Sequence, residues 1–399
     1  MTASIGSAVR RGFGWVFWPV VWTAVVANVL KGLPHQINDM GFPYWTMTYD
    51  EGFIRRGLVG TLVHEFFIGF DPDSQRKKVI ALHVALAFAF CAVLYLWARR
   101  ASQQVESSRA RSVVLTGTAA LLLSQFPTTA VASAGYLDIV LFYLCIGTAY
   151  LTDQGRYRAA GFVAAIGPLV HEAFLFLWLP IALIAVRRVI RLPIGERRAA
   201  IRQRSPIFSP LAVAAFTFLL HSPSAAERMI LKTPVGHDVQ ESFRLYQYGL
   251  GVGEAFGIML RKYADVPGQF VLACAFFLPA IVVTAVCAYA IDSTGARWRR
   301  ALFAFAVTFA PCSVLLVAWD LSRFLLWSGL GAFVLLMSNA ADAPSLLAPR
   351  SSLLATFAPA GGGRLRLRSR SPCSSSSRRA RMCTPTSRWR SRTIPRARH

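Results

Sequence analysis

The chain has 399 residues, of which 55% are hydrophobic and only 16% are charged, and its formal net charge is +24. Soluble domains are about one quarter charged, so this composition excludes an ordinary soluble globular protein and indicates a membrane protein. The positive charge does not indicate nucleic-acid binding, because no basic stripe with interleaved aromatic residues occurs in a soluble segment.

Apolar runs recur along the first 349 residues. A membrane-spanning helix needs about 20 predominantly apolar residues, and eight runs come close to that length. The first run lacks the small-residue cleavage site of a signal peptide, so we predict a retained span. The eight runs cover residues 14–30, 79–98, 113–132, 136–152, 206–221, 268–291, 301–319 and 324–340.

The loop that follows the first apolar run contains the stretch TYDEGFIRRGLVG, residues 48–60. Asp50 and Glu51 form an acidic pair there, and Arg55 and Arg56 form a basic pair. Four charges within so short a stretch exceed what a turn at a membrane surface needs, so we predict a functional role for them. The apolar stretch 57–70 is too short to span a membrane and predicts a helix that lies along its surface.

A ninth apolar run, 159–186, is too long for one span. As a single helix it would reach about 42 Å, against a hydrocarbon core of about 30 Å. It carries His171 and Glu172 near its centre, and an ionisable pair in the middle of a bilayer is costly. We therefore predict two short segments, 159–170 and 173–186, with the His-Glu pair at an outer turn between them.

Other ionisable residues lie at the ends of apolar runs. Asp138 begins one run, and Asp320 and Arg323 lie between the last two runs, where their spacing allows an ion pair on one helix face. Each has a structural alternative. Asp138 could favour a helix N-terminus, His171 and Glu172 could form a buried pair, and Asp320 and Arg323 could act as a clamp.

The charges of the loops favour ten segments with both termini in the cytoplasm. In this arrangement the interior loops of residues 1–349 hold 18 basic and 5 acidic residues, whereas the exterior holds 12 basic and 14 acidic residues. Such an imbalance is what the positive-inside rule describes. We predict an all-α polytopic protein of about ten transmembrane or half-membrane helices in the bacterial inner membrane, with larger exterior loops at 31–78 and 222–267.

The composition changes abruptly near residue 350. Residues 350–399 contain 13 Arg and no acidic residue, and a segment with so few large apolar side chains cannot fold alone. Two interpretations stay open. The segment is either a disordered basic tail that follows a membrane domain at 1–349 and is attracted to anionic lipid, or out-of-frame translation of GC-rich DNA.

Carboxylates and guanidiniums on the outer face suit the transfer of a sugar from a lipid phosphate. The acceptor hydroxyl needs a carboxylate that takes its proton, and the departing phosphate needs Arg or Lys where its charge develops. We assign Asp50 or Glu51 as the base and Arg55 and Arg56 as phosphate partners. The other predicted substrate-binding residues are Asp138, His171, Glu172, Asp320 and Arg323.

The acidic pair, the short paired segments and the outer charges resemble integral-membrane glycosyltransferases of the GT-C type. That resemblance implies a polyprenyl-phosphate sugar as donor, an Asp or Glu base in the first loop and, in some members, a divalent metal. The residues themselves predict no metal site, because no Cys-x-x-Cys pair occurs. Without a large soluble C-terminal domain like that of this type, acceptor recognition would fall to the 222–267 loop.

More narrowly, three short motifs resemble a group of uncharacterised bacterial multi-pass membrane proteins. The motifs are GFIRRGLVG (52–60), the His-Glu pair in PLVHEAFLFLWLP (168–180) and Asp-x-x-Arg in WDLSRF (319–324). This second resemblance implies a membrane location but no particular chemistry.

The predicted function is therefore glycosyl transfer to an envelope glycan or lipid acceptor at the outer face. Its predicted partners are membrane lipids and a lipid-linked sugar, and no nucleic acid. Two alternatives stay open. A polymerase or ligase of surface polysaccharide also uses outer-face arginines on lipid diphosphates. A transporter or flippase of a lipid-linked or anionic substrate would use intramembrane charges along a pathway, although no repeat of the two halves is seen.

Overall fold

The computed structural model describes eleven ranges of the chain, and the helices within them belong to one unit that ends at Ala348. Within the described ranges the chain is helical and has no strand. Arg55, Asp320 and the predicted tail 350–399 lie outside them. The described residues are 2–33, 41–53, 56–67, 71–133, 136–232, 236–238, 240, 257, 261, 267–316 and 321–343.

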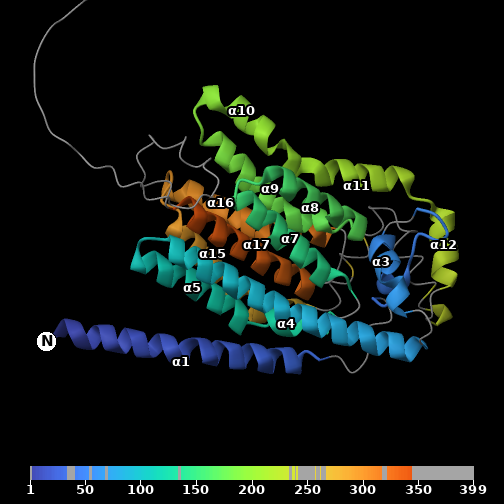
Figure 1. Cartoon of the computed structure of the whole chain (residues 1–399), viewed down its shortest axis with the longest axis horizontal. Helices are drawn as coiled ribbons and strands as arrows, with labels where there is room; N and C mark the ends of the chain where they lie inside the picture. The colour runs from blue at the N-terminus through green and yellow to red at the C-terminus, as the bar shows by residue number, and fades with distance from the viewer. Residues whose placement is uncertain are drawn as a thin grey trace, which may run out of the picture. The chain divides into compact units, whose positions relative to one another are not determined.

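Helices of very different length make up this unit (Figure 1). The longest are α1 (Thr2–Lys31), α4 (Pro72–Gln104), α15 (Pro267–Ile291) and α17 (Leu321–Asp342). Those of intermediate length are α5 (Ser108–Leu123), α7 (Asp138–Asp153), α8 (Tyr157–Val170), α9 (Phe174–Ile190), α11 (Ser209–Leu220) and α16 (Arg297–Phe309). The short elements are α2 (Pro43–Thr46), α3 (Gly57–Phe67), α6 (Phe126–Ala132), α10 (Ile194–Arg204), α12 (Pro223–Leu231), η1 (Ser205–Phe208) and η3 (Ala310–Leu316).

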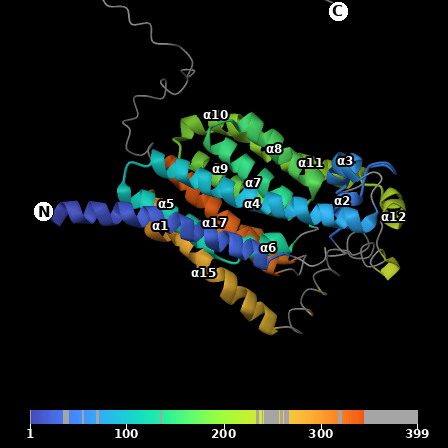
Figure 2. The same ribbon diagram turned by 60° about the horizontal axis from the view of Figure 1, so that its bottom comes forward.

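Helix α17 is the centre around which the others pack (Figures 1 and 2). In its most apolar stretch 94% of the residues are buried, whereas the corresponding stretches of α4 and α15 are only 33% and 28% buried. Apolar side chains on the outer helices, such as Phe162 and Leu219, are largely exposed. A surface so rich in apolar side chains is the arrangement expected of a helix bundle that is covered by lipid.

Three of the described helices are long and apolar enough to cross a membrane: Pro72–Gln104, Val271–Ile291 and Leu321–Asp342. The number rises to five if each of two bent helix pairs counts as one span. The chain is thus an all-helical protein whose described part carries three to five candidate membrane spans.

The break predicted within residues 159–186 is confirmed. Helix α8 ends at Val170 and α9 begins at Phe174, with His171 in an extended conformation between them. Of the predicted helix over 57–70, α3 covers Gly57–Phe67, residues 68–70 lie outside the described residues, and its position along the membrane surface stays a prediction. The run 113–132 is not one straight helix, because α5 and α6 meet at an angle of 42° next to Pro127, whose ring fits only the first turn of a helix.

Two glycines show how closely α8 packs against its neighbours. A Cβ on Gly161 would overlap the carbonyl of Pro206 in η1, so the two backbones approach within a distance that only glycine allows. On the other side of α8, a Cβ on Gly147 of α7 would meet the Val163 side chain at an ordinary 3.6 Å. These two sites therefore make a matched pair for substitution.

We expect Gly161→Ala to destabilise the protein by about 1–3 kcal/mol, because the added methyl overpacks a rigid backbone contact. Gly147→Ala should leave the stability unchanged or slightly raised, since alanine favours helix. Thermal unfolding in detergent measures both. Equal midpoints for the two variants would contradict the close approach of α8 and η1.

Candidate functional site

Arg56 of the first predicted exterior loop forms an ion pair with Glu172 of the turn between α8 and α9. Its Nε donates a hydrogen bond of 2.9 Å to Glu172 Oε2, and one terminal nitrogen contacts Oε1. The other terminal nitrogen donates to the Tyr44 hydroxyl over 2.9 Å. The side chains of Arg56 and Glu172 are only 7% and 19% exposed, so water screens this pair little.

The backbone of Arg56 lies in the left-handed region, with φ of 71°. An L side chain rarely adopts this conformation, which costs on the order of 1–3 kcal/mol and persists only where surrounding contacts hold it. The bonds to Glu172 and Tyr44 are such contacts. Strain of this kind is common at functional sites. Arg56 is therefore a candidate for a functional role.

Arg323, at the start of α17, forms a second ion pair with Asp138, the first residue of α7. The pair is bidentate, with Nε–Oδ2 and terminal nitrogen–Oδ1 distances of 2.6 and 2.7 Å. The guanidinium also lies over the Tyr136 ring, 3.9 Å from its centroid. The sequence predicted Asp320 as a partner for Arg323, but Asp320 lies outside the described residues. The described partner of Arg323 is Asp138, 185 residues away in the chain.

Aromatic rings join the two ion pairs. The Tyr44 ring lies 6.1 Å from that of Tyr136 and 5.6 Å from that of His171, centroid to centroid. Nδ1 of His171 accepts a hydrogen bond of 3.1 Å from the Ala173 N–H, so this nitrogen carries no proton and the imidazole is neutral. We call the whole set the two-arginine cluster: Tyr44, Arg56, Tyr136, Asp138, His171, Glu172 and Arg323.

The two predicted bases differ in their surroundings. Glu51 accepts a hydrogen bond of 2.9 Å from Arg228 Nε and also contacts the Lys232 ammonium, both in or next to α12. Hydrogen bonds from Lys232 and then from Arg228 lower the pKa of Glu51, which makes it a poor proton acceptor. Asp50 is exposed and accepts a hydrogen bond of 2.6 Å from the Thr48 hydroxyl. Of the pair, Asp50 is the better candidate for a base.

The Glu51 contacts belong to an interface between the two predicted exterior loops. The Ser222 N–H donates to the Phe53 carbonyl over 3.1 Å, and Gly52, with φ of 125°, lies against Ala225 of α12. Nothing in the periodicity of either loop predicted this contact. A signal was nevertheless present, because Arg228 and Lys232 are four residues apart and so present two cations on one helix face to one acid.

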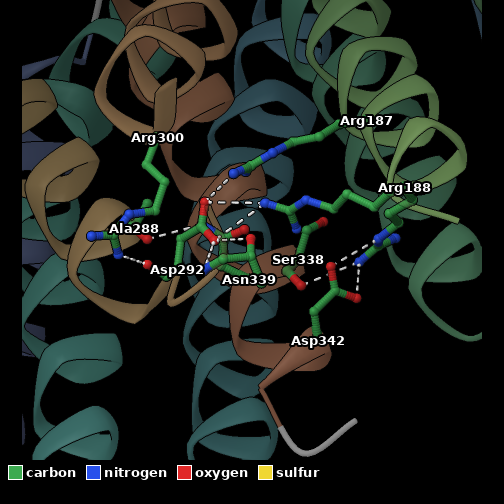
Figure 3. Close-up of polar contacts among 10 residues, drawn as sticks. Arg187, Arg188, Ala288, Asp292, Arg300, Ser338, Asn339 and Asp342 are labelled. Atoms are coloured by element: carbon green, nitrogen blue, oxygen red, sulfur yellow. Dashed lines mark hydrogen bonds and ion pairs between the residues drawn. The ribbon is translucent and has the colours of Figure 1, made fainter. Parts of the chain in front are cut away.

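A second charged cluster, which the sequence analysis did not single out, ties together the C-terminal ends of four helices (Figure 3). Arg187 and Arg191 contact Asp292 after α15, while Arg188 contacts Asp153 of α7 and Asp342 of α17. We call this set the three-aspartate cluster.

Asp292 of the three-aspartate cluster accepts hydrogen bonds from several donors. Burial alone would raise its pKa, but hydrogen bonds from Thr294 and from Arg187 outweigh burial and lower it, so Asp292 stays ionised. A carboxylate held in this way acts as a structural tie between helix ends and is a poor acceptor for a proton.

The two clusters lie at opposite ends of the same helices. Helix α7 begins at Asp138 and ends at Asp153, and α17 runs from near Arg323 to Asp342. Helix α9 likewise begins just after Glu172 and ends near the arginines that contact Asp292. At 1.5 Å per residue, the 16 residues of α7 separate the clusters by about 24 Å.

No protein-family model, curated protein or solved structure matches the chain. Within the described ranges, no group of three or more His, Cys, Asp and Glu side chains is arranged to hold a metal ion. The geometry of the described side chains is therefore what a functional proposal rests on.

We expect Asp138→Asn to destabilise the protein by about 3 kcal/mol, because it leaves the Arg323 charge buried without its counter-charge. Arg323→Gln should cost a similar amount, and the double variant should cost clearly less than the sum of the two. Unfolding midpoints measure this coupling, with Glu196→Gln on exposed α10 as a control that changes little. Additive losses would show that the pair is not coupled.

The contact of Glu51 with α12 should depend on pH. Because the folded pKa is lowered, the contact stabilises α12 fully above the ordinary pKa of glutamate, about 4.3, and is lost as the pH falls through the lowered value. The protection of the amides over residues 222–232, measured as their exchange rate relative to the intrinsic rate at the same pH, should therefore fall at acid pH in the native protein, whereas Glu51→Gln should show weak protection throughout. An unchanged exchange rate in this variant would refute the contact.

Proposed function

We propose that the chain is a membrane-embedded glycosyltransferase that moves a sugar from a polyprenyl-phosphate donor to an envelope glycan or lipid acceptor at the outer face of the bacterial inner membrane. The observation that carries the proposal is the two-arginine cluster. Segments far apart in the sequence bring two guanidiniums, each beside a carboxylate, together with a neutral imidazole and two phenols, to one end of the helix bundle.

The distribution of charges between the two clusters supports the proposed topology of ten segments. Arg56, Asp138, Glu172 and Arg323, which the sequence places outside, share the two-arginine cluster. The residues of the three-aspartate cluster all come from loops or helix ends that the sequence places inside. Helices α7, α9 and α17 would then all run from the outer face to the inner face, as the proposed topology requires.

The arginines would serve the donor phosphate. Each guanidinium is charged at any physiological pH and presents planar donors that match phosphate oxygens. In the absence of donor, Glu172 and Asp138 hold Arg56 and Arg323 in place. The two arginine side chains would therefore lose little further conformational freedom when a substrate binds. The phosphate would compete with these carboxylates for the guanidiniums, next to the Tyr44 hydroxyl, which accepts a hydrogen bond from Arg56.

Transfer then needs one base. The acceptor oxygen attacks the anomeric carbon, its proton passes to a carboxylate, and the phosphate leaves with the electrons of the bond that breaks. Asp50 suits the role of base because it is exposed and holds only a hydroxyl contact among the interactions described for it, whereas Glu51 is neutralised by two cations. Arg56 and Arg323 would stabilise the charge that develops on the phosphate.

The alternatives differ in where they need charges. A transporter or flippase would use ionisable groups along a path through the bundle, but the described charges of α7 and α17 gather at the helix ends, and the middle of α17 is apolar and buried. A polymerase or ligase acting on lipid diphosphates would use the same outer arginines. An assay that compares a lipid-diphosphate donor with a polyprenyl-phosphate sugar distinguishes this alternative from the proposed transferase.

We expect Asp50→Asn to lower the rate of sugar transfer by about 10²–10⁴, the usual contribution of a general base. The assay incubates the purified chain in lipid with a radiolabelled polyprenyl-phosphate sugar and follows release of the sugar from its lipid. Asp73→Asn, an exposed carboxylate in the first turn of α4, is the matched control and should keep full activity. Unchanged transfer in Asp50→Asn would remove Asp50 as the base, and movement of the lipid without cleavage would indicate a carrier.

A further inference from the structure

Helix α10 is an exposed helix at the same end of the bundle as the three-aspartate cluster. It begins three residues after α9 and contributes only Ala200 to the interior. Ile194 and Ile201 are 81% and 58% exposed, and their spacing of seven residues places them on the same side of the helix. Both views show α10 at the opposite end from α3 and α12 (Figures 1 and 2). Exposing two isoleucines to water is unfavourable, so this side of the short polar helix is expected to face an apolar environment.

The arginines of α10 fall into two groups. Arg197 turns back to the protein, donating to the carbonyls of Leu192 and Ile190 at the end of α9 over 3.0 and 2.8 Å, and Arg204 bonds to a tyrosine hydroxyl. Arg198 and Arg202 are exposed. At 100° per residue they lie beside the Ile194–Ile201 edge, within about 80° of Ile194. One face of α10 therefore combines two exposed cations with two exposed apolar side chains.

The N-terminal part of α16 carries an exposed apolar stripe. Trp298, Leu302 and Phe305 are 63%, 59% and 62% exposed and lie on one helix face, at spacings of four and three. A tryptophan at the end of such an apolar stripe is typical of the boundary between lipid tails and headgroups. The guanidinium of Arg299 lies over the Trp298 ring, 5.2 Å from its centroid.

Contacts between α9 and α16 bring these two features together. The guanidinium of Arg187, near the end of α9, lies 4.1 Å from the ring centroid of Phe303 in α16. Helix α10 starts only a few residues after Arg187, so its exposed face lies at the same end of the bundle as Trp298. The exposed cations of both helices then lie where lipid phosphates would be.

We infer that α10 lies in the headgroup layer of the membrane, with Ile194 and Ile201 dipping toward the acyl chains, and that Arg198 and Arg202 bind the phosphates of anionic phospholipids. The charge of these arginines selects an anionic headgroup, and the isoleucine edge selects a lipid over a free phosphate. The inference depends on the membrane location of the chain and not on sugar transfer, so a failure of one leaves the other standing.

The test titrates the full-length protein in neutral detergent with phosphatidylglycerol or phosphatidylcholine and follows bound lipid by the intact mass of the complex. We expect phosphatidylglycerol to bind more tightly than phosphatidylcholine. The double variant Arg198→Gln/Arg202→Gln should weaken phosphatidylglycerol binding by about 30-fold, since each basic residue near an anionic membrane surface contributes a factor of about five to the attraction. Arg198→Lys/Arg202→Lys should keep most of the affinity.

Two further variants separate this inference from simpler explanations. Arg197→Gln removes one charge from the same helix but not from its exposed face, so it should leave lipid affinity within about twofold of the native value even if it lowers stability. Ile194→Ser/Ile201→Ser should weaken lipid binding with all charges intact. Equal affinity for the two lipids, or full affinity in Arg198→Gln/Arg202→Gln, would overturn the inference and leave α10 as a surface for an acidic protein partner.

Discussion

The buried pairing of arginine with carboxylate is the interaction on which this helix bundle depends. An isolated charge in a medium of low dielectric is costly, and the cost falls only when an opposite charge lies within hydrogen-bond distance. Helices α7, α9 and α17 meet this constraint at both ends, through the two-arginine cluster at one and the three-aspartate cluster at the other. Because the pairs join different helices, they fix the order and direction of helices whose apolar flanks alone would pack in many ways.

This common principle leads to different chemistry at the two ends. At the three-aspartate cluster, Asp153 and Asp292 are almost fully covered, and each meets more than one donor, an arrangement that is complete without a ligand. At the two-arginine cluster the side chains of Glu172 and His171 retain 19% and 15% exposure, and Arg56 keeps a costly backbone conformation. The strain retained at Arg56 favours the two-arginine cluster as the place where the proposed substrate phosphate would bind.

The all-helical class and several of the helices were predictable from the sequence, because the length of apolar runs follows from general membrane physics, whereas the ten segments and the side on which each loop lies stay predictions. The break at His171 could be predicted, since the run 159–186 is too long and too polar at its centre for one span. The partners of the charges could not be predicted. Arg323 reaches Asp138 across 185 residues, and Glu51 reaches Arg228 across 177, and no local spacing encodes such contacts. Tyr44 and Tyr136 were also missed, because a tyrosine in an apolar chain gives no signal until its neighbours are known.

The central position of α17 has a consequence for how the bundle is made. This helix is the last one described along the chain, yet most of the others pack around it. While the chain is being synthesised, the surrounding helices reach the membrane before the element that fills their common interior. Until residues 321–342 arrive, Arg188 has Asp153 as its counter-charge but Asp138 lacks Arg323, so the partial bundle retains an uncompensated carboxylate at one end. Among the described helices, α17 is therefore the one whose insertion completes the apolar core and gives Asp138 its counter-charge.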